Sequence, residues 1–341
     1  DGLCGRYDEI SDFLVYETNG WVDPAQGAWE ELPYWLRGFG DLGYVTGNTG
    51  VLSRTQRWME GILGTQAADG WFGPERLRTS LESGPDFWPG MPLLAAFRSW
   101  YEYSGDERVI PFMTKYLGFQ NTQPPEVFNR SWGAFRWGDN IDSAYWLYNR
   151  TGDQWLLDLV GKMHSGSADY VNGIPTWHNV ELMHSFELLT RFTGDRSWTD
   201  KCEELAFNSL PASYDPQQQV MHYITCANSV QLDDRPKHGQ FQNPFPMQAY
   251  KYGVHQYRCC PHNYGMGWPY YAQELWLATT DNGLAASMYA ASKVTARVGA
   301  AGETVSIVQD TEYPFSDTIT FTVQGSARFP LYLRRPGWAH A

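Results

Sequence analysis

Two adjacent cysteines, Cys259 and Cys260, are the residues of this chain best suited to chemistry. They lie in the segment 257–263, Tyr-Arg-Cys-Cys-Pro-His-Asn, ahead of a helical run at 267–279. Three interpretations fit the pair: two buried free thiols on opposite sides of the backbone, a strained vicinal disulfide, or two thiolates that bind zinc. The C-x-x-C spacing common in zinc sites is absent, so spacing alone does not select the metal.

Paired carboxylates are the other candidates for acid–base chemistry, because cleavage of a glycosidic bond usually needs two. Glu30 and Glu31 are adjacent, so on a helix their side chains would diverge by about 100° and would not flank one bond. Asp139 and Asp142 lie three residues apart and could share a helix face, although Asp139 also fits a helix cap, which is the commoner role. Neither pair is a strong signal.

The aromatic content is high, with 16 Trp, 21 Tyr and 17 Phe. It indicates either a large packed core or a cleft that binds the apolar faces of sugar rings. Segments such as Gly-Trp-Phe-Gly-Pro at 70–74 and Arg-Trp-Gly-Asp-Asn at 136–140 have a loop-like composition, which favours the sugar-binding interpretation. Histidines beside aromatic residues, such as His178 and His222, are more often packing residues, but a sugar contact is compatible with this setting.

Composition excludes several classes of function. The 341-residue chain has a formal net charge of −13 and no basic run, which argues against nucleic acid and anionic membranes as partners. No apolar stretch reaches the roughly 18–20 residues of a membrane span. The five cysteines form no disulfide framework and leave the redox compartment open. The chain starts at Asp1 without a signal-peptide pattern, so we expect the true N-terminus to be absent.

A Gly-Asn or Gly-Asp pair recurs at 47–48, 105–106, 152–153 and 194–195. In each pair the glycine is suited to end one helix and the next residue to cap another. The glycines are spaced by 58, 47 and 42 residues, so the repeated unit is a helical hairpin. Repeated hairpins that must bury their faces predict a solenoid or a closed α/α toroid.

The pattern changes after about Gly283. Runs rich in β-branched or alternating residues predict antiparallel strands at 287–297, 304–309, 318–323 and 329–334. We therefore expect two domains, a mainly helical one at 1–283 and the first strands of an antiparallel β-sandwich at 284–341. Four strands are few for a sandwich, so we also expect its C-terminal part to be missing.

With these motifs together, the chain resembles the β-L-arabinofuranosidase family of glycoside hydrolases, family 127. The resemblance runs nearly end to end and rests on five segments: Trp-Glu-Glu-Leu-Pro-Tyr-Trp at 29–35, Tyr-Trp-Leu-Tyr-Asn-Arg-Thr-Gly at 145–152, Met-His-Ser-Phe-Glu-Leu-Leu at 183–189, Arg-Cys-Cys at 258–260 with Asn263, and Gly-Trp-Pro at 267–269. Together these segments are specific, whereas any one alone would be weak.

The resemblance implies an (α/α)6 catalytic toroid followed by β-sandwich domains, and a retaining mechanism. In this pattern one Glu and three Cys hold a zinc ion, a thiolate attacks the anomeric carbon, and a separate Glu is the acid/base. Carried over, Cys259 would be the nucleophile and a zinc ligand, and Cys260 a second ligand. His178 and Tyr223 fall at positions expected to contact the sugar.

The sequence departs from the family at one place. A block of about fifty residues, which carries the acid/base Glu and a Glu-x-Cys pair of ligands in the family, is expected before the helix near Glu181. Here Trp-His-Asn-Val at 177–180 continues directly into Glu181, and the last hairpin interval is correspondingly short. We expect a missing segment near 179–181, and a true deletion is the alternative.

Three functions are thus compared. The first is a zinc-dependent exo-acting glycosidase that removes a terminal furanose or related sugar from a glycan. The second is a catalytically inactive sugar-binding relative, and the third is a helical scaffold without chemistry. Bound zinc would distinguish the glycosidase from the other two functions, and sugar binding would distinguish the inactive relative from the scaffold. The favoured location is extracellular or periplasmic, while the sugar, the aglycone and the oligomeric state stay open.

Overall fold

The structure is a computed structural model that describes residues 7–9, 11–82, 84–166, 179–214, 220–222, 248–251 and 259–339. These residues belong to two compact units: Asp1–Thr176 with Val254–Met266, and Trp177–Gly253 with Gly267–Ala341. Each unit is described separately below.

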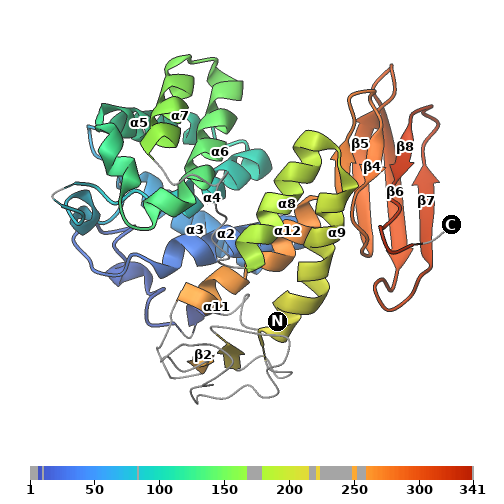
Figure 1. The fold of residues 1–341 in the computed structure, drawn as a ribbon, viewed down its shortest axis with the longest axis horizontal. Helices are drawn as coiled ribbons and strands as arrows, with labels where there is room; N and C mark the ends of the chain where they lie inside the picture. Colours follow the sequence, from blue (N-terminus) through green and yellow to red (C-terminus); the bar gives the residue numbers. More distant parts are fainter. Residues whose placement is uncertain are drawn as a thin grey trace. The chain divides into compact units, whose positions relative to one another are not determined.

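Helical hairpins dominate the first unit (Figure 1). The described helices of this unit before residue 167 are α2 (Glu31–Thr46), α3 (Thr49–Leu63), α4 (Gly90–Ser104), α5 (Val109–Thr122), α6 (Gly133–Thr151) and α7 (Trp155–Gly166), with 3-10 turns η1 (Tyr7–Glu9), η2 (Tyr16–Thr18), η3 (Glu75–Arg78) and η4 (Pro125–Asn129). The first helices of successive hairpins pack on one another, α2 on α4 and α4 on α6. This succession is the arrangement of an α/α toroid, as the sequence predicted.

The glycines of the recurring Gly-Asn and Gly-Asp pairs end helices as expected. Gly47, Gly105, Gly152 and Gly194 each adopt φ between 66° and 73°, a left-handed conformation that only glycine adopts at little cost. The residue after the glycine caps the next helix in two hairpins, Asn48 at α3 and Asp195 at α9 (Arg196–Glu204), whereas the N-cap of α5 is Arg108 and not Asp106 as expected. The Asn48 side chain, for example, accepts a hydrogen bond from the backbone N–H of Val51 at 3.1 Å. Local sequence therefore sets where these hairpins turn.

The aromatic segments at 70–74 and 136–140 differ from the loop-lined cleft expected of them. The first is a loop, but Trp71 and Phe72 are almost fully buried, and the Phe72 ring lies 4.5 Å from that of Tyr116. The second lies inside helix α6, which begins at Gly133. Core packing, and not a sugar cleft, accounts for Trp71 and Phe72.

The second unit contains a further hairpin, α8 (Asn179–Thr193) and α9 (Arg196–Glu204), which continues through a π turn (Leu205–Ser209) into α10 (Leu210–Ala212). Helix α12 (Gly267–Gln273) packs on α8. Strands β1 (Val220–His222) and β2 (Gln248–Lys251) pair antiparallel. Helix α8 is regular from Asn179 through Glu181, and the missing segment expected near this junction stays a prediction.

Two small sheets follow (Figure 1). One contains β3 (Trp276–Ala278), β4 (Leu284–Ala286) and β8 (Leu331–Leu333), and the other contains β5 (Ser292–Val298), β6 (Glu303–Thr311) and β7 (Ile319–Gln324). Their shared core includes Leu284 from the first sheet and Val298, Val305 and Ile307 from the second. Side chains of both sheets meet in one apolar layer, so this region is built as a sandwich.

One strand departs from the expected antiparallel pattern. Strand β8 pairs parallel to β4, whereas β5, β6 and β7 pair antiparallel as predicted. The chain leaves β7 and crosses to the other sheet, so β8 arrives beside β4 in the same direction. Residue alternation identifies a strand but not its partner, which explains the error.

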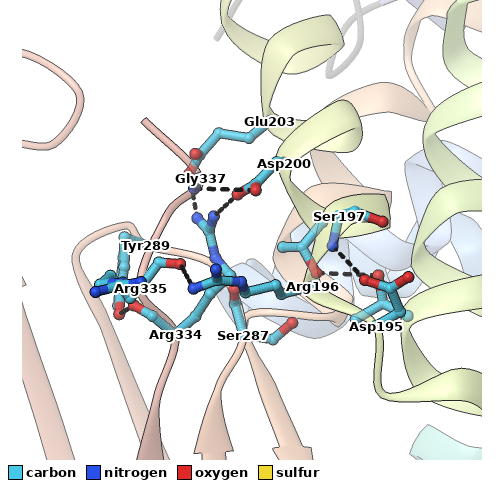
Figure 2. Close-up of polar contacts among 12 residues, drawn as sticks. Asp195, Arg196, Ser197, Asp200, Glu203, Ser287, Tyr289, Arg334, Arg335 and Gly337 are labelled. Carbon is cyan, nitrogen blue, oxygen red and sulfur yellow. Dashed lines mark hydrogen bonds and ion pairs between the residues drawn. The ribbon is translucent and has the colours of Figure 1, made fainter. Parts of the chain in front are cut away.

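An arginine joins the helical hairpin to the strands within this unit (Figure 2). Arg334, just after β8, is 4% exposed and forms ion pairs with Asp200 and with Glu203, the latter at 2.7 Å. Its Nε donates to the carbonyl of Ser287 at 2.5 Å, and its guanidinium lies 5.3 Å from the Tyr289 ring. Helix α9 and the strands are thus connected by a buried charge.

No described helix combines the length and the apolar composition that crossing a membrane would require.

Candidate active site

Helix α11 (Cys259–Tyr264) carries both cysteines in its first turn and packs against α2 within the first unit. Pro261 is tolerated there because the first backbone N–H groups of a helix have no intrahelical acceptor. Cys260 is 8% exposed, whereas Cys259 is only half-buried. The backbone therefore leaves Cys259 the more accessible of the two thiols.

The two sulfurs converge. Their Sγ atoms lie 3.9 Å apart, nearly twice the roughly 2.05 Å of a disulfide bond, so both cysteines are free thiols. The separation also shows that the thiols do not face opposite sides of the backbone. Two sulfurs at about 2.3 Å from one tetrahedral zinc would be about 3.8 Å apart, and the observed spacing matches this value.

The two thiols differ in acidity. The hydrogen bond from Cys260 is the main cause that lowers the pKa of the Cys259 thiol, while burial opposes it. The same hydrogen bond, together with burial, raises the pKa of Cys260. Cys259 is therefore the more acidic thiol of the pair.

Two charged side chains act on this pair. The negative charge of Glu30 raises the pKa of both thiols, and the positive charge of Arg136 lowers that of Cys259. Glu30 is the residue before α2, and Arg136 comes from α6. The guanidinium of Arg136 lies 5.4 Å from the ring centroid of Tyr34 and 5.3 Å from that of Trp88.

The remaining residues of the cysteine motif hold the helix in place. His262 is 1% exposed, its ring packs edge-on against Tyr7 at 4.4 Å, and its Nε2 lies 3.4 Å from the hydroxyl of Ser11. Asn263 donates from its amide to the carbonyl of Cys259 at 3.0 Å. Both side chains therefore position the turn that carries the cysteines.

The two candidate carboxylate pairs do not form an acid–base pair here. Glu31 is 1% exposed within α2, whereas Glu30 is half-buried, as their divergence on a helix predicted. Asp142 forms an ion pair with Arg98, which gives it a structural role. Asp139 lies well inside α6 and does not cap it, because that helix begins six residues earlier than Asp139.

Two predicted sugar contacts, His178 and Tyr223, lie outside the described residues. Among the residues that the structure describes, no three His, Cys, Asp or Glu side chains come together as a metal site. Cys259 and Cys260 are thus the part of the predicted zinc site that the structure places. Arg136 was not singled out from the sequence, and its neighbours in the chain gave no signal of contacts with α2 and Trp88.

Comparison with known proteins agrees with this description. The catalytic-domain profile of the GH127 β-L-arabinofuranosidases matches residues 16–171 and 168–273, and the middle-domain profile of the same family matches 283–341. No curated protein sequence matches the chain.

Several solved structures share the fold. The GH127 β-L-arabinofuranosidase Ara127N-Se from Geobacillus stearothermophilus T6 aligns with a TM-score of 0.67 at 16% identity, over 100% of this chain and 71% of that one. A structure described as a glycoside hydrolase gives 0.62 at 14%, over 100% and 70%. A GH127 β-arabinofuranosidase gives 0.59 at 13%, over 98% and 65%.

These likenesses establish an α/α toroid with a following β domain, and the two profiles cover most of the sequence. The chain therefore belongs to glycoside hydrolase family 127, the β-L-arabinofuranosidase family.

Proposed function

We propose that this glycoside hydrolase acts on a terminal β-L-arabinofuranose or a related sugar with retention of configuration, and that Cys259 is its nucleophile. Cys260 and Cys259 are two ligands of a zinc ion in this proposal. The substrate is a glycan, and the enzyme is exo-acting.

One observation carries the proposal: two free thiols converge to 3.9 Å in the family's catalytic domain, and the partly accessible one has the lowered pKa. A thiolate is the nucleophilic form of cysteine, so a lowered pKa favours attack by Cys259. Cys260 is buried, and its own pKa is raised, so it is the thiol of the pair that keeps its proton when Cys259 ionises. The assignment of nucleophile and partner follows from this asymmetry.

The two cysteines could supply two of the four ligands of a tetrahedral zinc site. The spacing of the two sulfurs suits two adjacent positions of a tetrahedral site, and soft thiolates suit this metal. Zinc, when bound, would keep its thiolate ligands deprotonated and fixed. The resemblance places the other two ligands in the block that the sequence skips before Glu181.

The proposed reaction has two displacements. The thiolate of Cys259 forms a C–S bond at the anomeric carbon as the bond to the leaving oxygen breaks, and that oxygen takes up a proton. Water then attacks the same carbon, loses a proton to a base, and releases the thiolate. Two inversions give retention. The leaving oxygen needs its proton because an alkoxide leaves poorly, and the resemblance assigns that proton to a Glu in the same block.

Substitution of each cysteine tests the proposal. We expect Cys259→Ser to lower turnover of an arabinofuranoside by at least about a thousandfold, because a serine hydroxyl is rarely ionised at neutral pH. Cys260→Ser should mainly weaken metal binding. The charge-transfer absorption of cobalt bound by thiolates, with cobalt used in place of zinc, measures this loss. Cys202→Ser is the matched control, since Cys202 is a fully buried thiol of the other unit.

The outcomes separate the rival functions. Full turnover by Cys259→Ser would rule out the nucleophile. Sugar binding without turnover or metal in the unaltered protein would instead identify the inactive sugar-binding relative.

A further inference from the structure

An open pocket lies beside η4 in the first unit. Its volume of about 370 Å³ falls within the roughly 300–1,000 Å³ of small-molecule sites. Five polar side chains line it: Glu82, Glu126, Asn129, Arg130 and Ser165. None of these five belongs to α2 or α11, the two helices that build the cysteine site. We call it the η4 pocket.

The backbone around the η4 pocket is strained at two residues. Glu82 and Ser131 adopt φ of 47° and 50°, left-handed conformations that residues other than glycine keep only where their surroundings impose them. Arg130 donates from Nη1 to the carbonyl of Leu81 at 2.9 Å, and its Nε lies 3.7 Å from the Glu82 carboxylate. Arg130 therefore holds the turn that carries Glu82. Strained residues held in this way gather at ligand-binding sites.

Two polar side chains of the pocket are free to bind a ligand. Glu126 and Asn129, both in η4, are exposed, and neither forms a hydrogen bond or an ion pair with another residue that the structure describes. Helix α7 ends against η4, and only glycine allows this approach, because a Cβ on Gly166 would lie 2.5 Å from the carbonyl oxygen of Pro125. Backbone packing thus sets the position of η4, and the fold does not use the polar groups of Glu126 and Asn129.

The chemistry of the pocket favours a neutral, hydroxylated ligand. The Arg130 guanidinium donates hydrogen bonds, whereas the carboxylates of Glu82 and Glu126 accept them. The Asn129 amide does both. Each hydroxyl of a sugar also donates and accepts, so a ring with neighbouring hydroxyls matches this mixture. The two carboxylates repel an anion such as a uronate, while the guanidinium repels a metal cation.

We propose that the η4 pocket is a second sugar-binding site, in which Glu126, Asn129 and Arg130 hold a neutral ring of a glycan. The glycans that a glycoside hydrolase cleaves carry further rings beside the one at the cleaved bond. The η4 pocket retains such a longer glycan on the enzyme and takes no part in bond cleavage. It is therefore independent of the role of Cys259.

Hydrogen exchange measured by mass spectrometry locates and quantifies this binding. Arabinotriose, a neutral glycan fragment, is titrated into the protein, and we expect slower exchange of the amides of η4. The concentration that gives half of this protection is the dissociation constant of the pocket. It should rise about tenfold or more in Glu126→Ala, because hydrogen bonds to charged groups are the stronger ones, and about threefold in Asn129→Ala. Both side chains are exposed and unpaired, so both variants should fold.

The matched control is Glu107→Ala, since Glu107 is another exposed glutamate of the first unit and does not line the pocket. Its dissociation constant should change by less than about twofold. Turnover of p-nitrophenyl β-L-arabinofuranoside, which has one sugar ring, should stay unchanged in all three variants. A loss of this turnover in Glu126→Ala or Asn129→Ala would make the pocket part of the catalytic site and overturn the proposal.

Three further results would overturn it. They are unchanged exchange of η4 with arabinotriose, equal protection in the unaltered protein and in both pocket variants, and protection by calcium or by digalacturonate in place of arabinotriose. Full turnover by Cys259→Ser would overturn the nucleophile alone and leave the η4 pocket standing.

Discussion

Replacement of Arg334 by methionine removes the charge that joins α9 to the strands while keeping most of the side-chain volume. In the native protein this guanidinium pairs with Asp200 and Glu203, donates to the carbonyl of Ser287 and packs on the ring of Tyr289 (Figure 2). The Arg334→Met protein would keep the apolar contact but leave both carboxylates without this partner.

Burial determines the size of the effect. The side chains of Arg334 and Glu203 are 4% and 6% exposed, whereas that of Asp200 is 26% exposed. Breaking a buried pair from one side costs about 3–5 kcal/mol, because the other charge stays buried without compensation. The partly exposed Asp200 adds at most about 1 kcal/mol. We expect a loss of about 3–5 kcal/mol in the free energy that holds α9 and the strands together.

Hydrogen exchange measured by mass spectrometry reports this loss locally, which avoids assuming that a chain of two units unfolds in one step. Amides of α9 and β8 should exchange roughly a hundredfold to a few thousandfold faster in Arg334→Met, at about 1.4 kcal/mol per tenfold. The Arg334→Met/Glu203→Gln double variant should recover part of this protection.

Arg108 provides the matched control. It also lies between two carboxylates, Glu60 at 2.6 Å and Asp106 at 2.7 Å, but its side chain is 55% exposed. Asp106 is 12% exposed, and without Arg108 it would keep the hydrogen bond that the Trp100 indole N–H donates at 3.1 Å. Arg108→Met should therefore cost no more than about 1 kcal/mol, measured in α5. Equal and small effects of the two substitutions would refute the reasoning from burial.

Two further predictions concern the second unit. Burial raises the pKa of Glu274 to about 7, against the charge of Arg191 at 3.2 Å, so between pH 4.5 and 7 the folded protein keeps a proton that the unfolded chain releases. The stability of the folded protein should therefore fall as pH rises through this window. Measured by urea denaturation, Glu274→Gln should raise the free energy of unfolding by up to about 3 kcal/mol at pH 8 but not at pH 4. A gain that does not change with pH would contradict this. Asp195→Ala removes the bond that its carboxylate accepts from the N–H of Ser197 at 2.9 Å, and should cost about 1 kcal/mol of protection in α9, whereas unchanged exchange there would contradict the cap.

The helical part of the fold was predictable from local sequence. A left-handed glycine and the capping residue after it act on the backbone within a few residues, so the ends of the hairpins are encoded where they occur, as at Gly47 and Gly194. The partner of a strand is set by contacts far apart in the chain, and for that reason the parallel pairing of β8 with β4 was missed.

The candidate site was also predictable only where local sequence determines it. The adjacent cysteines are visible in the sequence, and the resemblance of the chain to the family predicted their roles as nucleophile and zinc ligands. Arg136 reaches Tyr34 and Trp88 across about a hundred and about fifty residues of sequence, and no local pattern records such contacts. The composition around Trp71 also indicated a loop correctly but could not show that its ring is buried.

Covalent labelling tests the central claim most directly. A furanose-shaped epoxide or cyclophellitol analogue that reacts with cysteine is incubated with the protein, and the modified peptide is mapped by mass spectrometry. We expect one label, on Cys259, which disappears in Cys259→Ser and does not move to Cys202, whose burial raises its pKa. A label on an aspartate or glutamate, or a Cys259 that stays unmodified while the sugar binds, would contradict the account.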